Sequence, residues 1–124
     1  MSNNSTQYSK AKLANFKSIL TANLAMAEDE IQTLKSNQKS QKEQIVNTNV
    51  DFNENSKHFQ QQAKNKLLIR RLQNKSRQLR SALQRIEEST YGICERTGNL
   101  IREERLLAMP TARFDIKKRN NLRS

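Results

Sequence analysis

Hydrophobic residues recur every three or four positions along the first third of the chain. The stripe they form consists of Leu13, Phe16, Leu20, Leu24, Ala27, Ile31 and Leu34. Such spacing places the apolar side chains on one face of a helix. We therefore expect a helix from residue 11 to about residue 45. Its apolar pattern fades after Ser36 into polar residues, and the stripe needs a partner helix to cover it.

A second stripe of the same period follows an Asn-rich segment. Residues 47–56 include Asp51 and Glu54 among several Asn, and this composition predicts a turn or a helix restart. The second stripe consists of Phe59, Ala63, Leu68, Leu72, Leu79, Leu83 and Ile86. It predicts a helix from about Ser56 to Glu88. Two helices of similar length joined by a polar turn predict an antiparallel hairpin whose turn is an exposed tip.

The last third of the chain has a different character. It contains both glycines and the one proline, whereas residues 1–90 contain neither helix breaker. Tight turns are expected around Gly92 and Gly98, and a short helix is expected from Ile101 to Met109. We therefore predict an all-α protein with a lead (residues 1–10), a hairpin (11–88, tip near 47–56), and a small globular end with a basic tail (89–124).

Composition limits the size of the core and the class of partner. The chain has 124 residues, of which 34% are hydrophobic, and it carries a net charge of +11. These values predict one small domain and favour anionic partners. A single cysteine, with neither a long apolar run nor a signal-like start, predicts a cytoplasmic protein without a membrane span.

The second helix carries a run of positive charge that no acidic residue interrupts. Between Asn55 and Ile86 there are nine Lys or Arg and no acidic residue. Two interpretations stay open: a solvated helix face, or an electrostatic surface for phosphate or an acidic protein wall. Only one aromatic residue, Phe59, interleaves with these charges.

Two segments of the final third resemble the DksA/TraR family. Residues 82–98 carry an acidic pair followed by Tyr91-Gly92-Ile93-Cys94, and residues 101–112 carry Arg105-Leu-Leu-Ala-Met-Pro-Thr-Ala112. Residues 13–20 also resemble the start of the family's first coiled-coil helix. The resemblance implies a bacterial transcription regulator that binds RNA polymerase directly, inserts its coiled-coil tip into the secondary channel and modulates initiation. Some family members act with guanosine tetraphosphate in the stringent response.

The chain departs from the family at the zinc site. The family holds zinc with two Cys-x-x-Cys pairs, whereas the resemblance aligns these positions with Cys94, Thr97, Asp115 and Lys118. One thiol cannot replace four good ligands, so we expect a degenerate, zinc-independent member without a cofactor. Cys94 is then interpreted as a small packed residue.

The resemblance also proposes contact residues. It places Asp51, Glu54 and Ser56 on the family's tip motif, although Asp51 and Glu54 also fit a capping box at the start of the second helix. Further contacts to the polymerase or the alarmone are implied for Arg71, Arg105 and Arg119. Met109 stands where the family usually has Arg.

Rival functions remain beside the polymerase-binding regulator. Catalysis is not expected, because one His and one Cys far apart form no nucleophile–base pair and no phosphate-binding glycine loop is present. The alternatives are a basic, non-specific nucleic-acid-binding protein and a structural coiled-coil adaptor. We expect a monomer without sequence-specific DNA binding.

Overall fold

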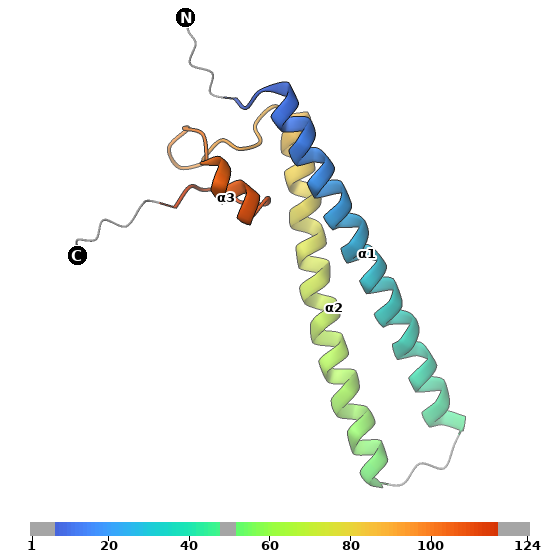
Figure 1. Cartoon of the computed structure of the whole chain (residues 1–124). Coiled ribbons are helices and arrows are strands. Elements are labelled where there is room, and N and C mark those ends of the chain that lie inside the picture. Colours follow the sequence, from blue (N-terminus) through green and yellow to red (C-terminus); the bar gives the residue numbers. More distant parts are fainter. Residues whose placement is uncertain (1–6, 48–51, 117–124) are drawn as a thin grey trace, which may run out of the picture. The chain divides into compact units, whose positions relative to one another are not determined.

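The structure is a computed structural model that describes residues 7–47 and 52–116, with the side chains of residues 7–43 and 56–116. Within these ranges the chain forms three helices, α1 (Lys10–Asn47), α2 (Phe52–Glu87) and α3 (Glu103–Ala108) (Figure 1). An isolated antiparallel bridge joins Ile93 to Leu100. The expected all-α fold, with two long antiparallel helices and a short third helix near the C-terminus, is confirmed.

The second helix begins earlier than its apolar stripe suggested. α2 starts at Phe52, inside the Asn-rich segment, rather than near Ser56. An apolar stripe marks only the part of a helix that packs against another element. The length of a helix that continues past its packed part is therefore underestimated from the stripe. The preceding residue, Asp51, lies outside the described residues.

The chain divides into two compact units. Unit 1 contains residues 1–22 and 78–124, and unit 2 contains residues 23–77. In each unit, a segment of α1 runs antiparallel to a segment of α2 (Figure 1). No described helix combines the length and the apolar character needed to cross a membrane.

Unit 2 has a seam of mixed polarity. On α2, Ile69 and Leu72 are buried, but so are Asn65 and Ser76 at the same spacing of three and four residues. The side-chain oxygen of Asn65 accepts a hydrogen bond of 3.1 Å from Gln61 Nε2, on the preceding turn. Polar groups at such positions weaken helix pairing while they fix its register. Unit 2 is therefore held by fewer apolar contacts than its helix length would allow.

Unit 1 contains the largest fully buried side chains of the described chain: Tyr91, Phe16, Leu20, Leu79, Ile101 and Leu106. The Phe16 ring lies 5.4 Å from the Tyr91 ring and 5.9 Å from the Tyr8 ring, measured between centroids. The Tyr91 hydroxyl donates a hydrogen bond of 2.7 Å to the carbonyl of Pro110, and the Tyr8 hydroxyl donates to that of Ile101. These aromatic residues join the start of α1 to the segment that follows α2.

The chain leaves α2 through a left-handed residue. Ser89 has φ 63°, while the N–H groups of Thr90 and Tyr91 both donate to the carbonyl of Arg85, at 2.8 and 3.1 Å. This arrangement satisfies a helix-end carbonyl and reverses the chain direction. Gly92 follows with φ 81°, and the chain then enters the segment that carries the candidate site.

Candidate functional site

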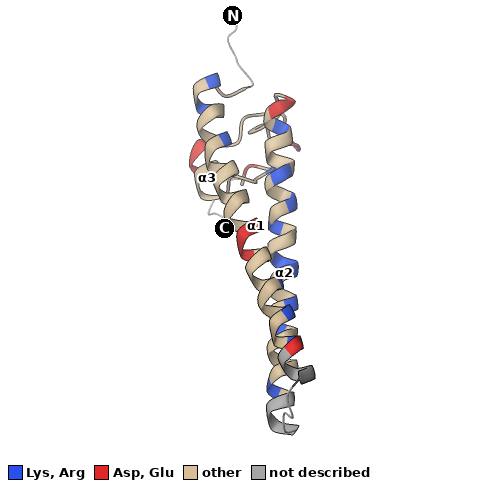
Figure 2. Ribbon diagram, turned by 90° about the vertical axis from the view of Figure 1, so that its right-hand side faces the viewer, with Lys and Arg blue, Asp and Glu red and all other residues tan. Residues whose placement is uncertain are grey.

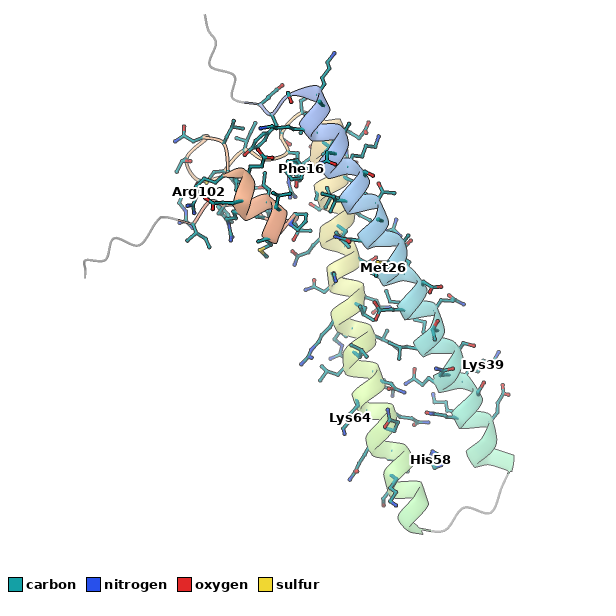
Figure 3. All side chains as sticks on the ribbon, viewed as in Figure 1. Phe16, Met26, Lys39, His58, Lys64 and Arg102 are labelled. Atoms are coloured by element: carbon teal, nitrogen blue, oxygen red, sulfur yellow. The ribbon has the colours of Figure 1, made fainter. Side chains whose placement is uncertain are left out.

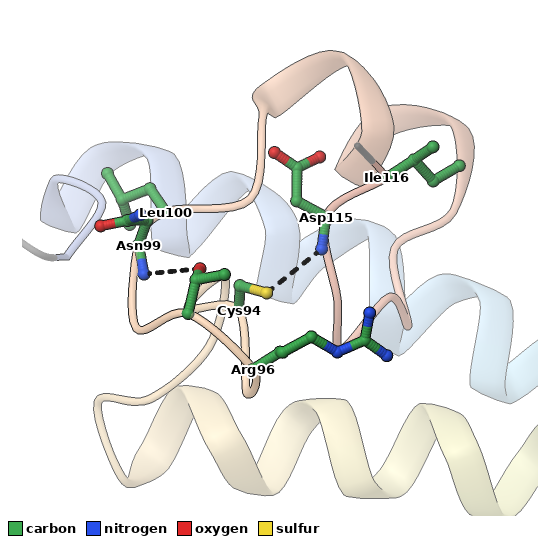
Figure 4. Close-up of a pocket in the computed structure, with 7 residues that line it drawn as sticks. Cys94, Arg96, Asn99, Leu100, Asp115 and Ile116 are labelled. Carbon is green, nitrogen blue, oxygen red and sulfur yellow. Dashed lines mark hydrogen bonds between the residues drawn. The ribbon is translucent and has the colours of Figure 1, made fainter. Parts of the chain in front are cut away.

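A knuckle-like turn, residues 93–100, forms the first half of the candidate site. The N–H of Cys94 donates to the carbonyl of Asn99 at 2.7 Å, and the N–H of Gly98 donates back to the carbonyl of Cys94 at 2.8 Å. The Thr97 hydroxyl accepts a 3.2 Å bond from the N–H of Asn99 (Figure 4). The Cys-x-x-Thr sequence therefore folds into a closed turn through its own hydrogen bonds.

The thiol of Cys94 faces the second half of the site. Its sulfur accepts a hydrogen bond of 3.5 Å from the backbone N–H of Asp115 (Figure 4), and the residue is only 3% exposed. The hydroxyl of Thr97 and the N–H of Asp115 lower the pKa of the thiol from 9.0 to about 7. Donors aimed at the sulfur favour its charged form, as expected from hydrogen bonding to a thiolate.

A cavity of about 310 Å³ lies beside the sulfur. It is lined by Cys94, Arg96, Thr97, Asn99, Leu100, Asp115 and Ile116 (Figure 4). Three of the four positions that the resemblance assigned to zinc, Cys94, Thr97 and Asp115, are thus brought together. The fourth, Lys118, lies outside the described residues.

The residues present do not fit a zinc ion. Tetrahedral zinc takes four thiolate, imidazole or carboxylate ligands, whereas this site offers one thiol. The carboxylate of Asp115 is paired with Arg102, whose Nε lies 3.1 Å from Oδ1. Across the described part of the chain, no three His, Cys, Asp or Glu side chains are grouped closely enough to hold a metal ion.

Arginine contacts connect the parts of the site instead. Arg102 donates to the carbonyl of Ile116 at 2.9 Å in addition to its pair with Asp115. Arg113 lies 2.9 Å from the carboxylate of Glu95, and the N–H of Glu95 donates to the carbonyl of Arg113 at 2.9 Å. Arg102 and the knuckle residue Glu95 are thus joined to the segment 113–116 by several hydrogen bonds and ion pairs, here called the arginine contacts.

Sequence reasoning did not find the arginine contacts. Arg102 is thirteen residues before Asp115, and no periodicity relates the two because the short helix α3 ends at Ala108, before Asp115 is reached. The sequence did contain one signal for the ion pair. Asp115 stands where the family has a metal ligand, and a carboxylate at that position needs a nearby cation. Arg85 was also missed as a structural residue. It donates to the carbonyl of Thr111 at 3.3 Å, and burial lowers its pKa.

The proposed tip residues are only partly described. Glu54 is the third residue of α2 and Ser56 is the fifth, whereas Asp51 and the side chain of Glu54 lie outside the described part of the chain. Ser56 is half-buried. Because α2 begins at Phe52, Asp51 directly precedes the helix and Glu54 stands three residues later, the spacing of a capping box.

The three arginines proposed as contacts are not gathered into one described site. Arg71 is exposed on α2 in unit 2. Arg105 belongs to unit 1, where its Nε donates a hydrogen bond of 2.7 Å to the carbonyl of Phe114. Arg119 lies outside the described residues. Arg105 therefore has a structural role in holding segment 113–116, whatever else it contacts.

The segment that forms the site matches a known family. Residues 89–114 match the family model of the prokaryotic dksA/traR C4-type zinc finger. The matched residues run from the left-handed Ser89, through the knuckle and α3, to Phe114. These residues therefore carry the sequence pattern of the DksA/TraR zinc finger. With one cysteine, the chain departs from the four-cysteine pattern of that family, in agreement with the ligand positions described above.

Comparisons with individual proteins agree with this assignment over short segments. The chain is 51% identical over 41 residues to an uncharacterised protein of Aquifex aeolicus (strain VF5), covering 33% of this chain and 28% of that protein. It is 50% identical over 36 residues to general stress protein 16O of Bacillus subtilis (strain 168), covering 29% and 22% respectively. The chain thus spans under a third of the length of these relatives.

A solved structure extends the likeness to most of the fold. Transcription factor DksA2 from Pseudomonas aeruginosa superimposes with a TM-score of 0.76, covering 86% of this chain and 78% of that chain at 22% identity. This likeness shows that the fold is DksA-like.

Proposed function

We propose that the chain is a cytoplasmic transcription regulator that binds RNA polymerase and inserts the α1–α2 turn into the secondary channel of the enzyme. The observation that carries this proposal is the DksA-like fold over 86% of the chain, together with the family match at residues 89–114. The solved relative is itself described as a transcription factor. DksA/TraR transcription factors are non-enzymatic, so the proposed role needs no catalytic group.

The acidic residues at the start of α2 are proposed to act at the tip. In the secondary channel, Asp51 and Glu54 would meet the basic and metal-bearing surroundings of the polymerase active centre. The competing explanation is purely structural: the two residues cap α2. A substitution that keeps the cap and removes the charge separates these explanations.

The double substitution Asp51→Asn and Glu54→Gln makes this separation. Asn caps a helix about as well as Asp, and Gln serves at the third position as Glu does. We expect polymerase binding to stay within about threefold of wild type, because the rest of the hairpin and unit 1 supply most of the contacts. Regulation of initiation, measured by in vitro transcription, should fall at least tenfold.

The matched control removes two acids elsewhere in unit 2. Asp29→Asn with Glu30→Gln changes the net charge equally at two exposed positions of α1 and should leave regulation unchanged. Co-purification of the tagged chain with RNA polymerase tests the partner itself. Absence of the polymerase from that preparation, or full regulation by the bound tip variant, would contradict the proposal.

A further inference from the structure

Basic side chains on α2 of unit 2 form two rows. At 3.6 residues per turn, one row consists of Lys57, Lys64, Arg71 and Lys75, here row A. The other consists of Lys66, Arg70 and Arg77, here row B. All seven residues are exposed, and Figure 2 shows Lys and Arg recurring along α2. The rows flank the buried positions Ile69 and Leu72, so they lie on the two sides of the helix pair.

These charges are not neutralised within the described chain. No described carboxylate is paired with a residue of row A, and the same holds for Lys66 and Arg70 of row B. Lys64 points away from α1 (Figure 3). Arg77 donates a hydrogen bond of 3.5 Å to a neutral partner, the side-chain oxygen of Asn74. The positive charges of both rows therefore face solvent without an acidic partner among the described residues.

The surface between the rows is uncharged and rich in amides. Gln60, Ala63, Leu67 and Asn74 occupy the outward stripe and are all exposed. Phe59, in line with row B, is 66% exposed. Amide side chains, Lys and Arg supply many of the contacts that proteins make to phosphate and sugar, and exposed aromatic rings stack on bases. Together these side chains have the chemistry of a surface that follows a nucleic-acid backbone.

We propose that rows A and B of α2 bind the phosphate backbone of a nucleic acid without reading its sequence. An acidic protein surface is the other partner that positive charge could fit. It is disfavoured because lysine is depleted in protein–protein interfaces, whereas lysine supplies four of the seven charges here. From Lys57 to Arg77 the rows extend about 30 Å along the helix, a length spanned by roughly nine phosphates of one strand. The proposal does not depend on binding to RNA polymerase.

The test measures binding of the free, full-length chain to nucleic acid as a function of salt. Fluorescent single-stranded RNA, single-stranded DNA and duplex DNA of mixed sequence serve as probes. Three triple variants remove three charges each: Lys64→Gln, Arg71→Gln and Lys75→Gln in row A; Lys66→Gln, Arg70→Gln and Arg77→Gln in row B; Lys35→Gln, Lys39→Gln and Lys42→Gln on α1 as the matched control.

Each row variant should reduce the slope of log affinity against log salt by about 2 for single strands and about 3 for duplex, because released counterions set this slope. The α1 control, also at exposed positions of unit 2, should change it by less than about 1. Phe59→Ala should weaken single-strand binding about tenfold and leave duplex binding unchanged. Thermal melts of every variant identify any loss of folding. A variant with Lys64→Arg and Lys75→Arg keeps both charges and should bind nucleic acid as the wild type does.

Three results would overturn the proposal. The first is no measurable binding to any probe at about 50 mM salt. The second is an equal loss in the α1 control, which would assign the effect to net charge alone. The third is polyglutamate binding as tightly as a nucleic acid of the same charge, which would make an acidic protein the partner.

Discussion

Two glycines with nearly the same φ angle differ in what surrounds them. Gly92 has φ 81° and Gly98 has φ 78°, so both lie where L side chains are disfavoured. A Cβ at Gly92 would lie 2.8 Å from the Tyr8 ring, whereas a Cβ at Gly98 would meet nothing within 4 Å. Substitutions at the two glycines therefore separate two losses of stability, one from the backbone φ angle alone and one from a steric clash of the added Cβ.

We expect Gly98→Ala to lower the free energy of unfolding by about 1 kcal/mol, the penalty of a left-handed alanine. Gly92→Ala should lower it by a further 1–3 kcal/mol or so, because the Tyr8 ring must move from a packed position. Urea denaturation followed by circular dichroism measures both values. Equal effects of the two substitutions would show that Tyr8 adapts without cost.

The Cys94 thiol should make stability depend on pH. Its pKa in the folded protein is about 7, lowered from 9.0, so between these values the unfolded chain binds more protons than the folded chain. The free energy of unfolding therefore rises as the pH increases from about 7 to 9, and this contribution is lost as the pH falls through 7. Cys94→Ser should remove the rise.

Urea denaturation at about pH 6 and at about pH 9, for wild type and Cys94→Ser, checks this expectation. The tyrosines contribute little in this range, because the pKa of Tyr8 and of Tyr91 is raised from 10.0, mainly by burial, so both hydroxyls stay largely protonated in the folded and the unfolded chain up to about pH 9. A pH dependence that is the same in both proteins would mean that the Thr97 and Asp115 donors do not stabilise the thiolate.

At the scale of the element, the polar seam of unit 2 limits stability. Asn65 is buried at 8% exposure in a position that the helix spacing assigns to the seam. We expect Asn65→Leu to raise the free energy of unfolding by about 1 kcal/mol, because apolar burial replaces an amide whose described partner is on its own helix. Asn74→Leu, at an exposed position, is the control and should change stability by less than about 0.5 kcal/mol. A loss of stability in Asn65→Leu would show that the amide is needed.

The elements were more predictable than the site. The four- and seven-residue spacing of Phe16, Leu20 and Ala27 predicted α1 to within a few residues, because burial on one helix face requires such spacing. The start of α2 at Phe52 was not predicted, since Asn-rich sequence supports both a turn and a helix end. The meeting of Cys94 with Thr97 and Asp115 followed from family resemblance. The arginine contacts could not be predicted, because they depend on the irregular path of residues 113–116.

At the scale of the whole molecule, the fold should not depend on zinc. The arginine contacts and the hydrogen bonds of the knuckle join the parts that a metal would hold in a four-cysteine relative. Treatment with a strong chelator should leave the helical circular dichroism signal and the melting temperature unchanged, and native mass spectrometry should give the mass of the metal-free chain. Stoichiometric zinc, or loss of helix on chelation, would contradict this.

A variant of the arginine contacts provides the complementary measurement. Arg102→Gln removes the pair with Asp115 and the bond to the Ile116 carbonyl. Because both side chains are partly exposed, we expect a loss of only about 1 kcal/mol in the free energy of unfolding. The loss should be the same with and without added zinc.

The hydrogen bond between Tyr8 and Ile101 also limits how early unit 1 can fold while the chain is being synthesised. The two residues are 93 positions apart, and the buried Phe16 likewise contacts Tyr91. Ribosomes add roughly 5–20 residues per second, so the start of α1 waits on the order of 5–20 s for its partners to be synthesised. Unit 2, a local hairpin, closes a much shorter loop. A nascent chain will therefore expose Phe16 and Leu20 to chaperones after the hairpin contacts of unit 2 have become available.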